Sequence, residues 1–432
     1  MAGLRAPGPR SATSLRSVSS RPELARRLGT GDAVVIGLGS MIGAGVFAVF
    51  APAARAAGSG LLVGLALAAS VAYCNATASA QLAAQYPTSG GTYVYGRERL
   101  GHWWGFLAGW GFVVGKTASC AAMALTFAAY TVPAGWQRPA AVAAVVTLTA
   151  VNYRGVTRTA RLTRVVVTVV LLALGVTVTA SLAGGDLDGS GIVVPVADTS
   201  GYGVLQSAGL LFFAFAGYAR IATMGEEVRD PERTIPRAIP LALFLALGVY
   251  VIVALTLLLT LGPDRLAAST APLAAALEAG RWPDLVPVAR VGAAAACLGA
   301  LLGLIAGIGR TGLAMAREAD LPRWLAAVHP RHHVPHRAEV VLAVVVCALV
   351  LTVDLRGAVG FSSFGVLAYY LVANIAAFTQ PADRRRWPRA LQVGGAFGCL
   401  VLAATLPWTS VLAGTCVLAA GALYRVLRLR AS

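Results

Sequence analysis

The chain has 432 residues, a mean hydropathy of +0.73 and a formal net charge of +17, with 57% hydrophobic but only 12% charged residues. Soluble globular proteins carry about a quarter charged residues, so this composition excludes an ordinary soluble domain. A membrane helix needs about 20 apolar residues, which gives the chain room for roughly a dozen spans. We therefore predict one all-α, polytopic membrane domain.

Twelve apolar runs follow one another along the chain and predict about 12 transmembrane helices. The first five lie at residues 32–54, 59–85, 104–131, 139–153 and 163–184. After a polar interval, seven more lie at 202–224, 237–261, 288–313, 338–353, 357–379, 391–407 and 409–427. Residues 1–30 are rich in Ser and Arg, like an organelle transit peptide, but Arg26 and Arg27 directly precede the first run. We therefore predict a disordered cytoplasmic tail there.

The distribution of arginine predicts the orientation of the chain, because short cytoplasmic loops retain Lys and Arg. With a cytoplasmic N-terminus, most of the 35 basic residues fall in the N-terminal tail, the inner loops and the C-terminus. We therefore predict a multi-pass protein of the plasma membrane with both termini cytoplasmic. This topology, with anionic lipid at the cytoplasmic face, explains the net charge without a nucleic-acid partner.

The cysteines and histidines favour neither a disulfide nor a cofactor. All six cysteines lie inside apolar runs without paired spacing and are expected to be small packing residues. Four of the five histidines lie in the segment HPRHHVPH, residues 329–336, which we predict to be a cytoplasmic loop. This loop is either a metal site or, as we favour, a solvated basic loop. We predict neither a metal nor a cofactor.

Glycines interrupt the first apolar run in the segment GLGSMIGAG, residues 37–45. Non-helical backbone at membrane depth is tolerated only where it faces protein or a water-filled cavity. The N–H groups freed at the start of a second half-helix suit a carboxylate, and glycine lets the backbone approach a ligand closely. The alternative is a glycine-rich face on which helices pack. This segment alone leaves both interpretations open.

A second interruption is predicted in residues 207–228, where Gly217 stands beside Tyr218 and the charged Arg220. The two interrupted runs are the first and the sixth, and breaks at corresponding positions of two halves are typical of transporters with inverted repeats. We predict a first repeat at residues 31–184 and a second at 202–379, followed by helices 11 and 12 at 391–428. The binding site is expected between the two breaks at the bilayer midplane.

At these residues the chain resembles the amino acid–polyamine–organocation (APC) superfamily of permeases. The resemblance covers nearly the whole chain and rests on four motifs: GSMIGAGVF at 39–47, YPTSGGTYVYGRERLGHWWGFLAGW at 86–110, FFAFAGYARIATMGEEVRDPERTIPRAI at 212–239 and GRTGLAMAREADLPRWLAAVHP at 309–330. It implies a LeuT-type fold, a 5+5 inverted repeat in which helices 1 and 6 are broken at the midplane.

The resemblance also implies the substrate site. The α-carboxylate of the substrate would meet backbone around Gly43, and its α-amino group would face carbonyls of helix 6 and of Met41. Phe213, Phe215 and Tyr218 would form an aromatic lid or wall, with ordinary helix packing as the alternative. The implied binding residues are Ser40, Met41, Ile42, Gly43, Ala44 and Gly45 in helix 1 and Phe213, Ala214, Phe215, Ala216, Gly217 and Tyr218 in helix 6.

Lys116 is the only lysine in the chain and lies within the third apolar run. A desolvated lysine can lose its proton whereas arginine effectively cannot, so Lys116 is our candidate for proton coupling. The alternative is that it pairs with a carboxylate or a carbonyl to hold helix 3. Matched to the family, Val170 replaces the helix 5 lysine of some proton-coupled members. Gly309 and Arg310 stand where sodium-coupled members carry helix 8 hydroxyls, which disfavours sodium.

Charged residues near the second break are candidates for gating ion pairs, with surface pairing as the alternative. Arg220 could attract an acidic substrate, face a water-filled vestibule or, as we favour, pair with Glu226 or Glu227. Arg310 is a further candidate. A fixed positive charge beside the pocket argues against a strongly cationic substrate. The resemblance also makes the loop between helices 2 and 3 part of an inner gate.

The sequence therefore predicts a secondary active transporter that moves a neutral amino acid, or a related amine, across the plasma membrane by proton-coupled alternating access. The first alternative is an obligate exchanger of amino acids or amines. A non-transporting amino-acid sensor is a further alternative, although neither terminus is long enough for a signalling domain. We do not expect an enzyme, because the chain has no HExxH or GxSxG motif and no pair of aspartates within its spans.

Overall fold

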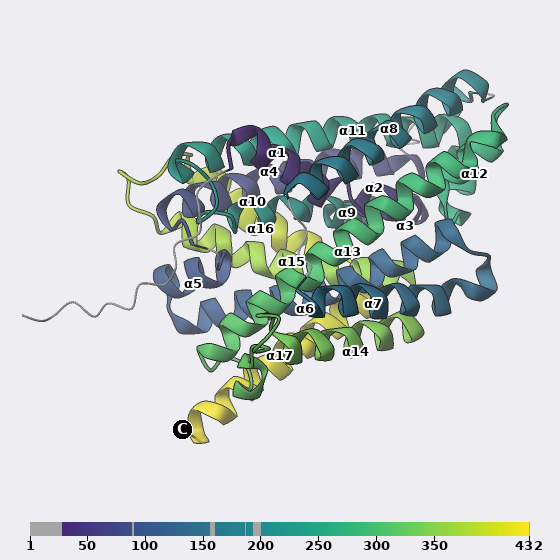
Figure 1. Ribbon diagram of the computed structural model, residues 1–432. Coiled ribbons are helices and arrows are strands. Elements are labelled where there is room, and N and C mark those ends of the chain that lie inside the picture. Colours follow the sequence, from purple (N-terminus) through teal and green to yellow (C-terminus); the bar gives the residue numbers. More distant parts are fainter. Residues whose placement is uncertain (1–27, 89, 156–159, 186, 193–199, 432) are drawn as a thin grey trace, which may run out of the picture.

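The computed structural model describes residues 28–431 apart from 89, 156–159, 186 and 193–199, and most of the predicted N-terminal tail lies outside this part. The described residues form helices and their connections, with one isolated bridge between Leu28 and Val228 in place of any strand. Figure 1 shows a bundle of helices lying side by side, with the C-terminus at the same end as α5.

Each predicted apolar run coincides with one or more helices. The first half contains α1 (Thr30–Met41), α2 (Gly45–Ala48), α3 (Phe50–Ala57), α4 (Leu61–Gln85), α5 (Thr92–Leu100), α6 (His102–Thr131), α7 (Gln137–Tyr153) and α8 (Ala160–Gly184). The second half contains α9 (Gly201–Phe215), α10 (Ala219–Ala222), α11 (Pro231–Ala268), α12 (Pro272–Glu278), α13 (Val286–Arg317), α14 (His336–Thr352) and α15 (Leu355–Phe378). The chain ends with α16 (Arg389–Thr405) and α17 (Trp408–Ala431).

Nine helical stretches of the described chain are long and apolar enough to cross a membrane. The other three predicted spans form α7, α14 and α16, which have 17 residues each. An all-helical chain with this many apolar helices is a multi-pass membrane protein.

Small residues bring the central helices into backbone contact. A Cβ atom on Gly365 of α15 would lie 2.8 Å from both the Gly111 carbonyl oxygen and the Gly115 Cα of α6. Close approach of this kind is how membrane helices gain van der Waals contact without a hydrophobic driving force. Elsewhere in the bundle, α13 packs on α6, and α1 packs on α11 and α8. The helix α4 packs on α9 and α11.

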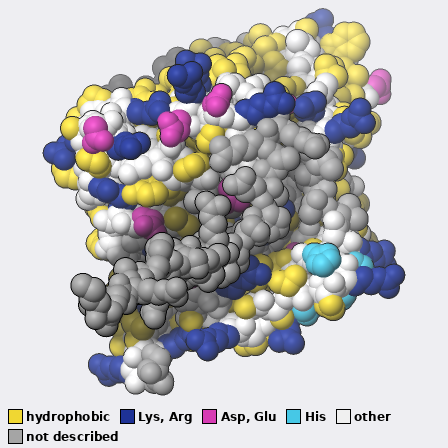
Figure 2. Space-filling view, turned by 60° about the vertical axis from the view of Figure 1, so that its left-hand side comes forward, with side chains coloured by type: hydrophobic (Ala, Val, Ile, Leu, Met, Phe, Trp, Pro, Cys, Tyr) yellow, Lys and Arg dark blue, Asp and Glu magenta, His cyan; other side chains and the backbone are white. Residues whose placement is uncertain are grey.

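Basic side chains gather at the end of the bundle that carries α5. In Figure 2, where this end comes forward, Lys and Arg side chains outnumber Asp and Glu side chains on the visible surface, and histidines lie toward one side. Arg97 and Arg99 of α5 belong to this end, together with Arg323 in the connection before α14, Arg337 in the first turn of α14 and the C-terminal Arg428.

Candidate functional site

The first membrane helix is interrupted where its glycines predict a break. α1 ends at Met41, residues 42–44 bend out of the helix, and α2 resumes at Gly45. The sixth apolar run behaves differently, because α9 passes into a 3₁₀ turn at Ala216–Tyr218 before α10 begins. The second break is therefore a tightened turn of helix and not an unwound segment.

The two breaks touch each other through glycine. A Cβ atom on Gly217 would collide with the backbone of Ser40 and Met41, and one on Gly45 would lie 2.8 Å from the Cα of Ala214. The packing interpretation therefore applies to Gly45 and Gly217, which let two backbones approach, while residues 42–44 leave the helix. The structure brings the predicted binding residues of both runs together.

The backbone carbonyls at the breaks already have a hydrogen-bond partner in a tyrosine that sequence reasoning missed. The Tyr250 hydroxyl of α11 lies 2.7 Å from the Met41 carbonyl oxygen and 2.9 Å from that of Ala214. Its ring packs edge to face on Phe215 at 5.1 Å, so Phe215 is a packing residue. A tyrosine alone among aliphatic residues was the available signal, because a buried phenol hydroxyl usually finds a partner.

Lys116 reaches the 3₁₀ turn of the second break. Its Nζ atom lies 3.4 Å from the Ala216 carbonyl oxygen, and the side chain is only 7% exposed. The hydroxyl of Tyr370 on α15 donates to the same oxygen at 3.3 Å, and its ring stacks on Tyr218. Of the partners considered for Lys116, the observed one is a carbonyl. Tyr370 is a second residue that sequence reasoning missed.

The ion pair favoured for Arg220 is not formed. Within the described part of the chain, Arg220 lies under the influence of Glu227 and of Arg310, but it makes no ion pair. Ser40, predicted to help bind the carboxylate, instead donates its hydroxyl to the Ile36 carbonyl one turn earlier. The Ser40 hydroxyl is thus engaged within its own helix, and the Arg220 guanidinium is not engaged in an ion pair within the described residues.

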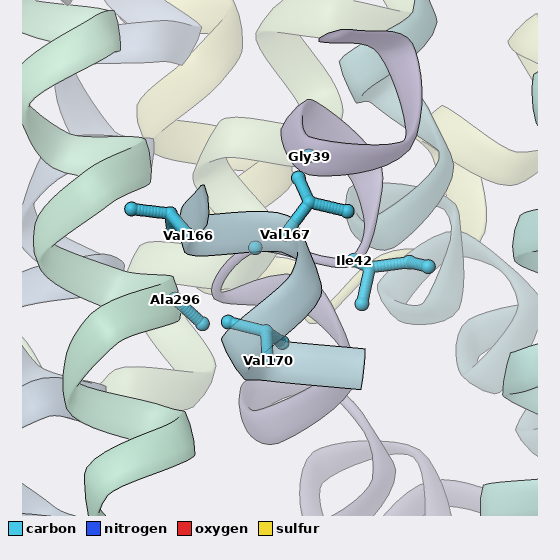
Figure 3. A pocket seen from close by; sticks show the side chains of 7 residues that line it. Gly39, Ile42, Val166, Val167, Val170 and Ala296 are labelled. Atoms are coloured by element: carbon cyan, nitrogen blue, oxygen red, sulfur yellow. The ribbon is translucent and has the colours of Figure 1, made fainter. Parts of the chain in front are cut away.

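A small apolar cavity lies against the first break (Figure 3). Its volume is about 10 Å³, room for one water molecule at most, so this cavity is too small for an amino acid. The cavity is lined by Gly39, Ile42, Gly43, Val166, Val167, Val170 and Ala296.

This cavity corrects the prediction of which helix 8 residues face the first break. Val170 does face the first break, but the facing residues of α13 are Ala296 and Ala300, whose Cβ lies 3.0 Å from a Cβ built on Gly43. Gly309 instead packs on Glu339 of α14. Alanine carries no hydroxyl, so these positions still offer none of the side-chain oxygens that a sodium ion would need.

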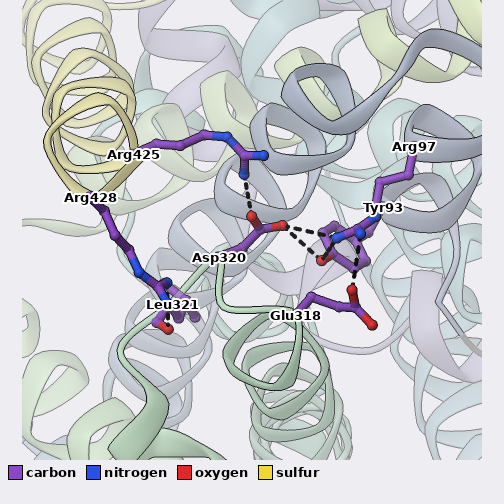
Figure 4. Close-up of polar contacts among 7 residues, drawn as sticks. All are labelled: Tyr93, Arg97, Glu318, Asp320, Leu321, Arg425 and Arg428. Carbon is purple, nitrogen blue, oxygen red and sulfur yellow. Dashed lines mark hydrogen bonds and ion pairs between the residues drawn. The ribbon is translucent and has the colours of Figure 1, made fainter. Parts of the chain in front are cut away.

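A buried ion cluster joins three elements at the α5 end (Figure 4). Asp320, 6% exposed, accepts hydrogen bonds from Tyr93 of α5 at 2.8 Å and from Arg425 of α17. Arg97 of α5 pairs with Asp320 at 3.4 Å and with Glu318 at 2.9 Å. Burial, together with the hydrogen bond to Asp320, raises the pKa of Tyr93, so its phenol stays protonated and donates. We call these five residues the Asp320 cluster.

The histidine loop packs around one tyrosine. The rings of His329, His332 and His336 lie 5.4, 6.2 and 6.1 Å from the ring of Tyr153 at the end of α7. Among the residues that the structure describes, no group of three or more His, Cys, Asp or Glu side chains is arranged to hold a metal ion.

The many apolar helices define a multi-pass membrane protein. Residues 32–431 match the family model described as amino acid permease. The chain belongs to this family, which confirms the resemblance to the APC permeases and points to a transporter rather than an enzyme.

Relatives of known name fit this assignment. The chain is 61% identical over 408 residues to an uncharacterized transporter of Mycobacterium tuberculosis, covering 94% of this chain and 92% of that protein. It is 23% identical to a branched-chain amino acid permease of Bacillus subtilis, covering 92% and 91% of the two chains. It is 27% identical to cationic amino acid transporter 7, chloroplastic, of Arabidopsis thaliana, covering 84% and 67%.

Proposed function

We propose that this permease takes up a neutral amino acid across the plasma membrane by proton-coupled alternating access. The observation that carries the proposal is the junction of the two breaks, where backbone groups of residues 41–45 and 213–217 meet beside the ammonium group of Lys116. Backbone amides suit a carboxylate and backbone carbonyls suit an ammonium group, so an amino acid needs no charged side chain here.

The architecture proposed with this function is a LeuT-type 5+5 inverted repeat of twelve spans. Residues 31–184 would form the first repeat, 202–379 the second and 391–428 the last two helices. The 17 residues of α7, α14 and α16 extend about 26 Å, which is at the lower end of the spanning range. The basic α5 end would be cytoplasmic, with both termini and contacts to anionic lipid there.

Substrate binding is proposed to displace contacts that close the site. The α-carboxylate would take the N–H groups of residues 43–45 at the start of α2. The α-amino group would replace the Tyr250 hydroxyl at the carbonyls of Met41 and Ala214. The positive charge of Arg220 close to the second break favours a neutral over a cationic side chain.

Lys116 is proposed to carry the coupled proton. As an ammonium group it can donate to the Ala216 carbonyl, and as an amine it has no charge with which to hold that turn. Protonation of Lys116 would thus stabilise one arrangement of the second break and deprotonation would release it. Arginine could not replace it, because a guanidinium keeps its proton.

We expect Lys116→Ala to lose accumulation driven by a proton gradient while substrate binding persists. The measurement uses purified protein in proteoliposomes with labelled leucine, alanine, glutamate and arginine, with and without an imposed inward proton gradient. Wild-type protein should concentrate a neutral amino acid only when the gradient is present. The Lys116→Arg variant, which retains the charge but not the titration, should fail in the same way.

The same vesicles distinguish symport from obligate exchange. An exchanger would ignore the gradient and take up label only when an unlabelled amino acid is preloaded inside. That result would leave Lys116 as a residue that holds α6 to the second break. Binding of an amino acid without any flux would instead favour a sensor.

A further inference from the structure

Glu339 is a buried acid outside the proposed substrate site. It lies in the first turn of α14 and is only 1% exposed. A Cβ atom on Gly309 of α13 would lie 3.2 Å from its Cγ atom, so α13 packs directly on the side chain. Burying a carboxylate is costly unless its charge is paired and hydrogen-bonded.

The hydrogen bonding of Glu339 is only half complete. Asn152 of α7 donates its Nδ2–H to the Oε1 atom at 2.8 Å. The Oε2 atom is equally buried and has no hydrogen-bond partner among the residues that the structure describes. A carboxylate can accept at both oxygens, whereas a protonated carboxyl carries its own hydrogen on one of them. The unpartnered oxygen is therefore the atom where a proton would reside.

The charged group that acts on Glu339 belongs to α13. Arg310 of α13 is the charged group that acts on the carboxyl, but the two form no ion pair within the described chain. On the loop side, His336 begins α14 and packs against Tyr153 of α7. On α6, which also packs on α14, Cys120 belongs to the same buried cluster as Leu342 and Val346 of α14, and Lys116 of α6 acts on its thiol. A proton on Glu339 thus changes chiefly the balance of charge felt by Arg310.

Arg310 connects Glu339 to the second helix break. It acts on Arg220 as a like charge, and Arg220 stands two residues after Tyr218. A charged Glu339 attracts Arg310, whereas a neutral Glu339 leaves Arg310 and Arg220 to repel each other. The state of Glu339 can therefore bias the position of α10 relative to α13 through charges that are already in place.

We propose that Glu339 is a proton-binding residue of the transport cycle, with Oε2 as the atom that accepts the proton. The step forms one O–H bond and neutralises one carboxylate, and the proton is released when the carboxyl ionises again. This inference rests on the proposed proton-coupled transport and adds to Lys116 a second protonation site, on α14.

The experiment compares wild-type protein with Glu339→Gln in proteoliposomes, using labelled leucine, alanine, glutamate and arginine. Glutamine keeps the acceptor for Asn152 and resembles the protonated acid, so the variant should fold. We expect it to lose accumulation driven by an inward proton gradient but to keep equilibrium exchange of label at equal pH. Glu232→Gln is the matched control, because Glu232 is an exposed acid at the start of α11, and it should accumulate label like the wild type.

A second measurement does not depend on transport. Infrared difference spectra of the purified protein during acidification should contain the C=O stretch of a carboxyl that becomes protonated, and this band should be missing from Glu339→Gln. If the variant loses exchange as well as accumulation, the infrared band decides whether Glu339 binds the proton. A band that is unchanged in the variant overturns the proposal.

The outcomes separate the inference from the proposed function. A wild-type protein that ignores the gradient would contradict proton coupling itself, and the role of Glu339 with it. A wild-type protein that responds to the gradient, with a Glu339→Gln variant that accumulates label equally well, would overturn only the role of Glu339.

Discussion

Gly217→Ala is expected to abolish transport, because the added methyl group would lie on the Ser40 carbonyl group of the first break. The obstacle is backbone and not the far end of a flexible side chain, so the two breaks must separate. Overpacking of this kind typically costs about 1–3 kcal/mol. Separation would also remove the arrangement in which the carbonyls of Met41 and Ala214 share one hydrogen-bond partner.

The measurement is amino acid uptake into proteoliposomes, with the amount of folded protein checked by size-exclusion chromatography. Gly248→Ala in α11 is the matched control, because a Cβ atom there meets nothing within 4 Å. Alanine is also the better helix former, so this control should fold and transport normally. Normal uptake by Gly217→Ala would mean that the two breaks need not touch.

Asp320→Ala is expected to destabilise the folded protein by about 3–5 kcal/mol, since it removes one partner of a buried ion pair and leaves Arg425 without its carboxylate. It also removes the acceptor for the Tyr93 hydroxyl. Arg425 retains its stacking on Trp103 and Phe106, but aromatic faces replace only part of an ion pair. The loss should loosen α17 and α5 from the end of α13.

The measurement is the free energy of unfolding in detergent. Glu318→Ala is the matched control two residues earlier, because Glu318 pairs with Arg97 but its side chain is 55% exposed. Exposed pairs contribute about 0–1 kcal/mol, so the control should lose little. Equal losses in the two variants would show that burial of the Asp320 cluster does not determine its contribution.

Hydropathy predicted the position of every long helix, and glycine content predicted the first break. Both signals are local: an apolar run of sufficient length has few other structures available in a bilayer. The second break was less predictable, because Gly217 is compatible with both an unwound segment and the observed 3₁₀ turn. Which of the two forms depends on the Ser40 backbone, far away in the sequence.

The residues of helix 8 that face the first break could not be identified from its sequence. Residues 288–313 are apolar on nearly every side, so no polar face marks which residues point toward the first break. The family pattern placed Gly309 and Arg310 there, but Ala296 and Ala300 lie at that position. Such a helix offers many rotations and positions along its axis with similar hydropathy, and only packing against α6 and α8 selects one.

The contacts of Tyr250, Tyr370 and Glu339 were likewise outside the reach of sequence reasoning. Tyr250 meets Met41 across 209 residues of sequence, and Glu339 meets Asn152 across 187. From sequence alone, a single acid near the start of an apolar run, such as Glu339, is interpreted as a charge in a loop. Only the structure shows that α13 covers it. The residue types were visible in the sequence, but their partners were not.

We propose above all that the two breaks hold the α-carboxylate and the α-amino group of an amino acid. Competition for uptake tests it most directly, using the amino acid that the vesicles accumulate, its amide, which lacks the carboxylate, and its 2-oxo acid, which lacks the amine. We predict that the unlabelled amino acid competes and that neither analogue does. Effective competition by either analogue would contradict the claim, because one set of backbone groups would then be dispensable.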